Sequence, residues 1–208
     1  MRKSFPKGIY LITHADSTFI VEEVVEQAAK AGIAAVQLRD KIIDDAGYVA
    51  LGNRLSEILA PLNIPLILND RIHLYSRIKA QGVHVGQGDS KVAHARELIG
   101  DEPFLGLSIG FLSELEKTDF SKVDMVGIGP VFQTNTKKNH RAPIGIDGFK
   151  SINTHLPVPG FAIGGVEKKH IIDIKKSGAS GIALISAICK AEDPGQEAQD
   201  IVNLWRQE

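Results

Sequence analysis

Residues 18–41 read TFIVEEVVEQAAKAGIAAVQLRDK, and this stretch contains the pattern that decides the fold. Its first part has the spacing of an amphipathic helix, with apolar residues at Ile20, Val21, Val24, Val25, Ala28 and Ala29. Gly32 follows at the place where a helix C-terminus favours glycine. The apolar run after it ends in polar residues and is typical of a strand buried on both faces. We therefore predict a helix over Thr18–Ala31 and a strand over Ala34–Arg39.

The same alternation of strand and helix repeats along the chain. Short apolar runs bounded by Gly, Pro or Asp predict strands over Ile9–Thr13, Ala34–Arg39, Pro65–Asn69, Gly82–Val85, Phe104–Ser108, Asp124–Gly129, Gly160–Gly164 and Gly181–Ser186. Helical patterns lie at Thr18–Ala31, Asp45–Leu59, Ile72–Lys79, Lys91–Ile99, Leu112–Lys117, Gly148–Thr154, Lys168–Ser177 and Pro194–Gln207. Asp193 is the expected N-cap of the last helix, with Pro194 in its first turn.

Eight such units in 208 residues predict an α/β protein, a (β/α)8 TIM barrel formed by a single domain over residues 1–208. A doubly wound open sheet is the structural alternative. That fold places a glycine-rich turn after its first strand. Residues 13–16 of this chain, Thr-His-Ala-Asp, follow the first predicted strand and contain no glycine. The barrel is therefore favoured.

Composition limits the partners that the chain can bind. Twenty-four basic against 25 acidic residues leave a formal net charge of −1, so the overall basic field that favours nucleic-acid binding is missing. No apolar run approaches the ~20 residues that span a bilayer, so we expect a soluble protein with no membrane partner. Cys189 is the only cysteine, which excludes an internal disulfide and suggests a reducing, cytoplasmic location. An anion would have to be bound by a local cluster.

Such a cluster is predicted at the ends of the strands, where the active site of a TIM barrel lies. Gln37, Arg39 and Lys41 are spaced by two, so they share one face if the strand continues. Two cations at the barrel mouth would repel each other without an anion between them, which indicates an anionic ligand. Asp70 and Asp89 follow neighbouring strands, and two carboxylates beside these cations fit an Mg²⁺ that bridges to phosphate oxygens. Helix capping is the alternative role for each aspartate.

The second half of the chain predicts another anion site, built from backbone N–H and hydroxyl groups. Gly164 and Gly165 would let the backbone approach a ligand closely, and Ser186 follows the eighth strand, where this fold commonly binds phosphate. Thr134 and Thr136 lie in a connection of about 18 residues, a length typical of a functional loop or lid. We interpret His84 as a strand residue with a hydrogen-bonded ring rather than as a catalyst.

Taken together and in order, seven motifs resemble those of the thiamine phosphate synthase family. They are Q-L-R-D-K at 37–41, N-D-R at 69–71, G-V-H-V-G-Q-G-D at 82–89, G-L-S at 106–108, G-I-G-P-V-F-Q-T-N-T-K-K at 127–138, A-I-G-G at 162–165 and I-S-A-I at 185–188. The resemblance covers about Gly8 to Pro194. It implies a TIM-barrel transferase that joins 4-amino-5-hydroxymethyl-2-methylpyrimidine diphosphate to hydroxyethylthiazole phosphate. The implied products are thiamine monophosphate and pyrophosphate, formed through a dissociative, Mg²⁺-assisted substitution.

The resemblance also implies a role for each matching residue. Gln37 would hold the pyrimidine, Ser108 would face the pyrimidine and the diphosphate, and Asp70 and Asp89 would bind Mg²⁺. The diphosphate would be held by Arg39, Lys41, Asn69 and Lys137. The thiazole phosphate would be held by Thr134, Thr136, Gly165, Ile185 and Ser186. The groups that act on the leaving diphosphate, and are therefore called catalytic, are Arg39, Lys41, Ser108 and Lys137.

The sequence departs from the family pattern in three places and leaves two other functions open. Gln133 stands where the family usually has proline, Asn139-His140 replaces a common acidic residue, and His14 follows Thr13 where aspartate is frequent. A thiazole tautomerase of the same fold is one alternative, but its catalytic histidine would fall at Gly110. A phosphate-binding relative without catalytic activity is the other. A homo-oligomer is compatible with either enzyme.

Overall fold

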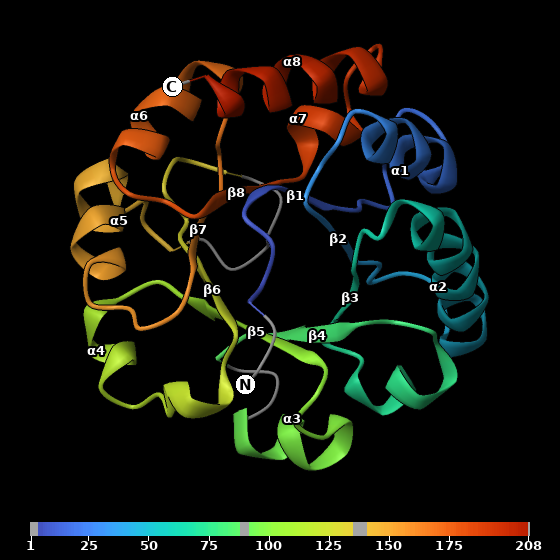
Figure 1. Cartoon of the computed structure of the whole chain (residues 1–208), viewed down its shortest axis with the longest axis horizontal. Coiled ribbons are helices and arrows are strands. Elements are labelled where there is room, and N and C mark those ends of the chain that lie inside the picture. Colours follow the sequence, from blue (N-terminus) through green and yellow to red (C-terminus); the bar gives the residue numbers. More distant parts are fainter. Residues whose placement is uncertain (1–3, 88–91, 135–140, 208) are drawn as a thin grey trace.

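The computed structural model describes residues 4–87, 92–134 and 141–207 and is built around a closed barrel of eight parallel strands (Figure 1). In chain order around the barrel these are β1 (Gly8–Ile12), β2 (Ala35–Leu38), β3 (Leu66–Asn69), β4 (Gly82–Val85), β5 (Phe104–Ile109), β6 (Met125–Ile128), β7 (Gly160–Ile163) and β8 (Gly181–Leu184). Gly8 lies opposite Gly181 where β1 pairs with β8. The predicted TIM barrel is confirmed.

Helices cover the outside of the barrel, as Figure 1 shows. The α-helices are α1 (Val21–Lys30), α2 (Asp45–Leu59), α3 (Val92–Ile99), α4 (Leu112–Leu115), α5 (Gly145–Asn153), α6 (Ile171–Lys176), α7 (Ser186–Cys189) and α8 (Pro194–Arg206). Short 3-10 helices lie at η1 (Ala60–Leu62), η2 (Ile72–Arg77), η3 (Phe120–Lys122) and η4 (Lys168–His170). The Asp193 side chain accepts from the Gln196 N–H at 2.9 Å, which confirms the predicted cap of α8.

Several predicted helices differ from the structure. The one expected over Gly148–Thr154 begins at Gly145, the one over Leu112–Lys117 ends at Leu115, and the one over Lys168–Ser177 is the 3-10 helix η4 followed by α6. The helix α7 was not predicted.

Two further differences have a physical cause that the structure shows. The helix predicted over Thr18–Ala31 begins at Val21, because Ile20 before it has an extended backbone with ψ 145°. The preceding segment is held against α7, where the Thr18 N–H donates to the Cys189 carbonyl at 2.9 Å. The segment predicted as a helix over Ile72–Lys79 is the 3-10 helix η2, which ends at Arg77. It stops there because Ile78 is extended and packs against Gly52 of α2, where a Cβ would lie 2.9 Å from the Ile78 side chain.

Apolar side chains form two separate layers. The larger lies between the strands and the helices and includes Leu38, which is fully buried. The smaller fills the barrel interior and includes a group of aromatic side chains at the N-terminal end. There Phe5 packs edge-to-face against the rings of Tyr10, Phe104 and Phe161 at centroid distances of 5.5, 5.2 and 5.5 Å. This aromatic plug closes one end of the barrel.

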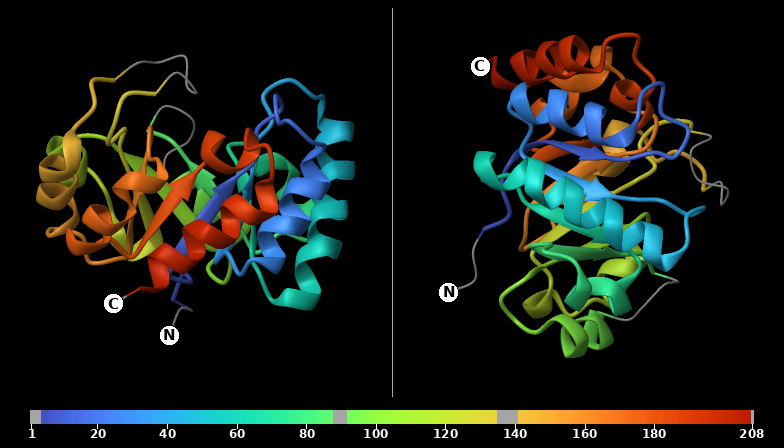
Figure 2. Two further views of the ribbon diagram at one scale, coloured as in Figure 1. Left: turned by 90° about the horizontal axis from the view of Figure 1, so that it is seen from above. Right: turned by 90° about the vertical axis from the view of Figure 1, so that its right-hand side faces the viewer.

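The opposite end of the barrel carries the connections that leave the strand C-termini. Both chain ends lie on the plugged side, whereas the connections after β2 and β6 extend on the other (Figure 2, left). Ligands therefore have to approach from the side where the sequence places its polar clusters. Among the helices of the described residues, none is both long and apolar enough to cross a bilayer.

Candidate active site

The end of β2 places Gln37 inside the barrel. Its side chain is 2% exposed, and its amide Nε2 donates to the Tyr10 hydroxyl at 2.8 Å. Burial raises the pKa of Tyr10, so this hydroxyl stays protonated. Leu38, the next residue, packs in the outer layer. The predicted alternation is therefore confirmed for these two residues, and Gln37 faces the interior.

Thr13 fixes the backbone of Arg39 just beyond the paired part of β1 and β2. The Arg39 N–H donates to the Thr13 hydroxyl oxygen at 2.9 Å, and that hydroxyl lies 3.2 Å from the Arg39 carbonyl oxygen, to which it can donate. The Thr13 hydroxyl thus takes the place of the next backbone hydrogen bonds between β1 and β2 and holds the two strand ends together. Sequence reasoning singled out Arg39 but assigned no function to Thr13, although a buried polar residue at a strand end is a signal that could have found it.

The ammonium group of Lys41 pairs with the carboxylate of Asp70, across the ends of β2 and β3. Asp70 itself has φ +62°, a left-handed conformation that turns the chain sharply after β3. Both groups keep contact with solvent, with side chains 52% exposed for Lys41 and 19% for Asp70. The predicted repulsion between cations at this mouth is relieved in part by the protein's own carboxylate.

Tyr48 of α2 joins the ends of β2 and β3 from outside the barrel. Its hydroxyl donates to the Leu38 carbonyl at 2.7 Å and accepts from the Asn69 N–H at 3.2 Å. The Arg71 guanidinium lies over the Tyr48 ring at 4.6 Å and donates to the Ile43 carbonyl at 2.6 Å. The loop that contains Lys41 is thus fixed by a buried tyrosine that no sequence motif had indicated.

Ser108, at the end of β5, is held by two side chains from β4 and its following turn. The Ser108 Oγ lies 2.9 Å from His84 Nε2, and the Gln87 amide donates to the Ser108 carbonyl at 3.2 Å. His84 has the hydrogen-bonded ring that the sequence interpretation expected. Its partner, however, is one of the predicted site residues.

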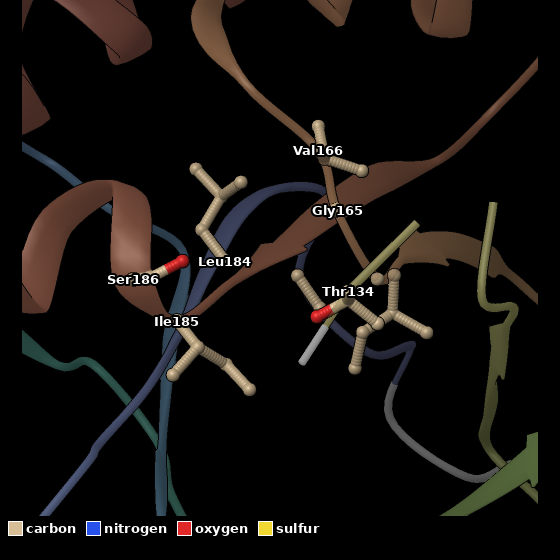
Figure 3. A pocket seen from close by; sticks show the side chains of 9 residues that line it. Thr134, Gly165, Val166, Leu184, Ile185 and Ser186 are labelled. Carbon is tan, nitrogen blue, oxygen red and sulfur yellow. The ribbon is translucent and has the colours of Figure 1, made fainter. Parts of the chain in front are cut away.

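A hollow, called the second hollow because it lies apart from the charged groups after β2 and β3, is formed by the ends of β7 and β8 and by Thr134 from the connection after β6. Its lining includes Thr134, Gly164, Gly165, Ile185 and Ser186, together with Ile163, Val166, Ala183 and Leu184. Figure 3 shows the hydroxyls of Thr134 and Ser186 on opposite sides of it. The two glycines have φ +93° and +64°, and a Cβ on Gly165 would lie 2.4 Å from the Gln133 carbonyl oxygen. Backbone packing at this turn therefore requires glycine.

The structure brings most predicted site residues to the open end of the barrel as two groups. Gln37, Arg39, Lys41, Asn69, Asp70 and Ser108 come from β2, β3 and β5, and Thr134, Gly165, Ile185 and Ser186 line the second hollow. Asp89, Thr136 and Lys137 lie outside the described residues. Within residues 4–87, 92–134 and 141–207, no three His, Cys, Asp or Glu side chains gather as a metal site.

A sequence profile of the family described as "Thiamine monophosphate synthase" matches residues 9–188 of the chain. The chain belongs to the thiamine monophosphate synthase family. It is 38% identical over 202 residues to the thiamine-phosphate synthase of Psychrobacter sp. (strain PRwf-1), covering 94% of this chain and 93% of that protein. It is 37% identical to the thiamine-phosphate synthase of Archaeoglobus fulgidus, covering 96% and 93%. These similarities make the chain an enzyme of the transferase class.

Solved structures agree with the family. The thiamine phosphate pyrophosphorylase from Pyrococcus furiosus superposes with a TM-score of 0.87 at 27% identity, and 95% of each chain is covered. A 3-hexulose-6-phosphate synthase superposes with a TM-score of 0.69 at 15% identity, covering 95% of this chain and 99% of the other, which reflects the shared fold alone. The high score of the first match extends the family resemblance to almost the entire barrel.

Proposed function

We propose that this family member joins 4-amino-5-hydroxymethyl-2-methylpyrimidine diphosphate to hydroxyethylthiazole phosphate, giving thiamine monophosphate and pyrophosphate. The observation that carries the proposal is the division of one barrel mouth into two unlike halves. Charged groups from β2 and β3 occupy one half, and hydroxyl and glycine residues at β6, β7 and β8 occupy the other. A diphosphate suits the first half and a phosphate monoester suits the second.

In the charged half, Arg39, Lys41, Asn69 and Lys137 bind the diphosphate. Gln37 holds the pyrimidine, and Ser108 faces both the pyrimidine and the diphosphate. The C–O bond to the diphosphate opens first, so negative charge builds on the leaving oxygens while the pyrimidine methylene becomes cationic. Fixed cations bind this charge distribution more tightly than they bind the substrate, which lowers the barrier. The thiazole nitrogen then captures the cation, and no nucleophilic side chain takes part.

We propose that Asp70 and Asp89 hold Mg²⁺ beside the diphosphate. The contact that supports this role is the Lys41 ammonium at the Asp70 carboxylate, because it shows that the carboxylate faces the mouth and accepts a cation there. When bound, Mg²⁺ would neutralise part of the charge on the leaving oxygens. Lys41 can then contact the diphosphate beside it.

In the second half, the hydroxyls of Thr134, Thr136 and Ser186 and the backbone of Gly165 bind the thiazole phosphate. Ile185 lines the second hollow and belongs to the same phosphate site. Backbone N–H groups and hydroxyls bind a phosphate monoester by directed hydrogen bonds, without adding a further cation to the mouth. The two substrates are thereby bound by different chemistry, which keeps each in its own half.

A tautomerase activity is disfavoured by the surroundings of Gly110. A Cβ at this position would lie 2.5 Å from Nη1 of Arg141, whose guanidinium pairs with Glu114 at 2.9 Å. The ion pair therefore occupies the space that a catalytic histidine would need.

A pyrophosphate-release assay tests the proposal. Purified enzyme with Mg²⁺ and both substrates should release pyrophosphate and form thiamine monophosphate, and omission of the thiazole phosphate should stop thiamine monophosphate formation. Removal of Mg²⁺ with a chelator should abolish turnover, and re-addition should restore it. Tight binding of both substrates without any pyrophosphate release would contradict the proposal and favour a non-catalytic phosphate-binding protein.

A further inference from the structure

The ring of His84 occupies the centre of the barrel, in space left by two glycines. His84 is 7% exposed. A Cβ on Gly106 of β5 would lie 2.3 Å from the imidazole Nδ1, and one on Gly127 of β6 would lie 3.5 Å from its Cε1. Any side chain at Gly106 would therefore displace the ring. The interior is shaped around an imidazole at this position.

The ring points towards Ser108, which our proposed function places against the diphosphate and the pyrimidine. The register pairs His84 with Gly106, so Ser108 stands two residues further along β5, towards the open mouth. The Ser108 Oγ lies 2.9 Å from His84 Nε2. Gln87 also holds the Ser108 carbonyl, so β4 and its turn fix both the backbone and the hydroxyl of this residue.

The hydrogen-bonding capacity of a serine hydroxyl decides whether His84 or Ser108 is the donor in the hydrogen bond between them. A serine hydroxyl has one hydrogen to donate and two lone pairs that accept. The leaving diphosphate offers only acceptor oxygens, so Ser108 assists it only if that hydrogen is free to point at the diphosphate. His84 must then be the donor, with its proton on Nε2.

We infer that His84 is a positioning residue for the synthase reaction. Its neutral Nε2–H tautomer donates to Ser108 Oγ, which fixes the rotamer of Ser108 and directs the serine hydrogen towards the departing diphosphate. The inference rests on the proposed function, because it gives Ser108 a substrate to face. It assigns His84 no contact with the substrate and no proton transfer.

Two substitutions of similar size separate this role from simple packing. The amide nitrogen of glutamine can take the place of Nε2, whereas that of asparagine reaches only the place of Nδ1. His84→Asn should lower kcat about tenfold, the effect of one neutral hydrogen bond, with a smaller change in KM. His84→Gln should stay within about threefold of the wild-type kcat. Circular dichroism and thermal melting of both variants give the matched control for folding.

A double-mutant cycle with Ser108→Ala shows whether His84 acts through the serine. In the Ser108→Ala background, adding His84→Asn should change kcat less than about twofold, because the contact is already gone. Equal losses in both backgrounds would overturn the inference. Wild-type enzyme that releases no pyrophosphate would instead overturn the proposed function, so the two failures are distinguishable.

Nitrogen-15 NMR of histidine-labelled wild-type enzyme tests the tautomer directly and requires no variant. A neutral His84 with its proton on Nε2 supports the inference. A neutral ring with its proton on Nδ1, or an imidazolium, overturns it, because the direction of the bond to Ser108 would then be reversed or the ring charged.

Discussion

Lys41 has a partner in the structure, Asp70, and a second one, the diphosphate, in the proposed reaction. Its ammonium pairs with Asp70 at a site with considerable solvent contact, so the pair adds only about 0–1 kcal/mol to stability. In the proposed reaction, the same ammonium binds the diphosphate that enters the mouth. Its electrostatic contribution to turnover should therefore exceed its contribution to folding.

Lys41→Ala should lower kcat about a hundredfold while the circular dichroism spectrum stays that of the wild type. The reason is that charge on the leaving oxygens would lose one fixed cation. Steady-state kinetics with both substrates measure the effect, and Lys137→Ala is expected to behave in the same way. Lys30→Ala removes a comparable exposed ion pair, with Glu26, from α1 and should leave turnover unchanged. Undiminished kcat in Lys41→Ala would remove this lysine from the reaction.

Tyr48→Phe deletes one hydroxyl and nothing else. Because that hydroxyl links the Leu38 carbonyl to the Asn69 N–H, its loss should destabilise the fold by about 1–3 kcal/mol. It should also raise KM for the pyrimidine diphosphate more than KM for the thiazole phosphate. Urea denaturation and two-substrate kinetics measure the two effects, with Tyr75→Phe on η2 as the control. Equal changes in both KM values would argue against a local effect on the charged half.

At the scale of elements, the turn after β7 contains Gly165, whose backbone packs against a neighbouring segment and also lines the proposed thiazole phosphate site. Gly165 combines a positive φ with a close approach to the Gln133 carbonyl, so the turn and the segment that brings Thr134 to the hollow are in direct contact. We therefore expect a larger residue at Gly165 to move Gln133 and, with it, the neighbouring Thr134 hydroxyl.

Gly165→Ala should raise KM for the thiazole phosphate and lower the melting temperature. The positive φ alone costs an alanine about 1–2 kcal/mol, and the clash with Gln133 adds to it. Gly100→Ala is a matched control, because Gly100 has φ +78° but no atom within 4 Å of the added Cβ. The control should lose stability without any change in KM. A similar KM for both variants would contradict the role of the turn.

The sequence alone predicted the elements whose signal is local. Apolar runs located the strands, and the Asp193–Pro194 pair located the start of α8. The start of α1, the helix α7 and the 3-10 geometry of η2 and η4 were missed. The segment before α1 contacts Cys189 and the end of η2 packs against Gly52, and both contacts join residues that are distant in sequence. The same reason explains Tyr48: its role depends on two backbone groups from other elements.

As with the fold, the sequence predicted part of the candidate site. The rule that strand C-termini meet at one end of a barrel sufficed to group the site residues. It could not show that Asp70 meets Lys41, because that contact depends on a left-handed backbone conformation at Asp70. Nor could it show the partner of the His84 ring, which depends on glycines in two other strands.

At the scale of the whole molecule, the reactivity of the Cys189 thiol indicates whether the barrel is folded. It is 1% exposed, and burial raises the pKa of its thiol to about 11. Since the thiolate is the reactive form, a raised pKa means that the folded protein holds almost no thiolate at neutral pH.

Cys189 should therefore resist a thiol reagent such as dithionitrobenzoate in the native enzyme at pH 7–8 and react fully in denaturant. The rate should rise with pH, because a larger share of the thiol ionises as the pH approaches its pKa of about 11. Rates measured across a urea series should follow global unfolding. Rapid labelling of native enzyme would contradict the buried position.

The aromatic plug around Phe5 has a consequence for the order of events during turnover. Because the aromatic plug closes one end of the barrel, substrates must enter and products must leave at the same, open end. Neither product can leave through the plugged end, and a product that is still bound at the mouth blocks binding of the next substrate. Departure of the products, as much as bond breaking, is then a step on which selection can act.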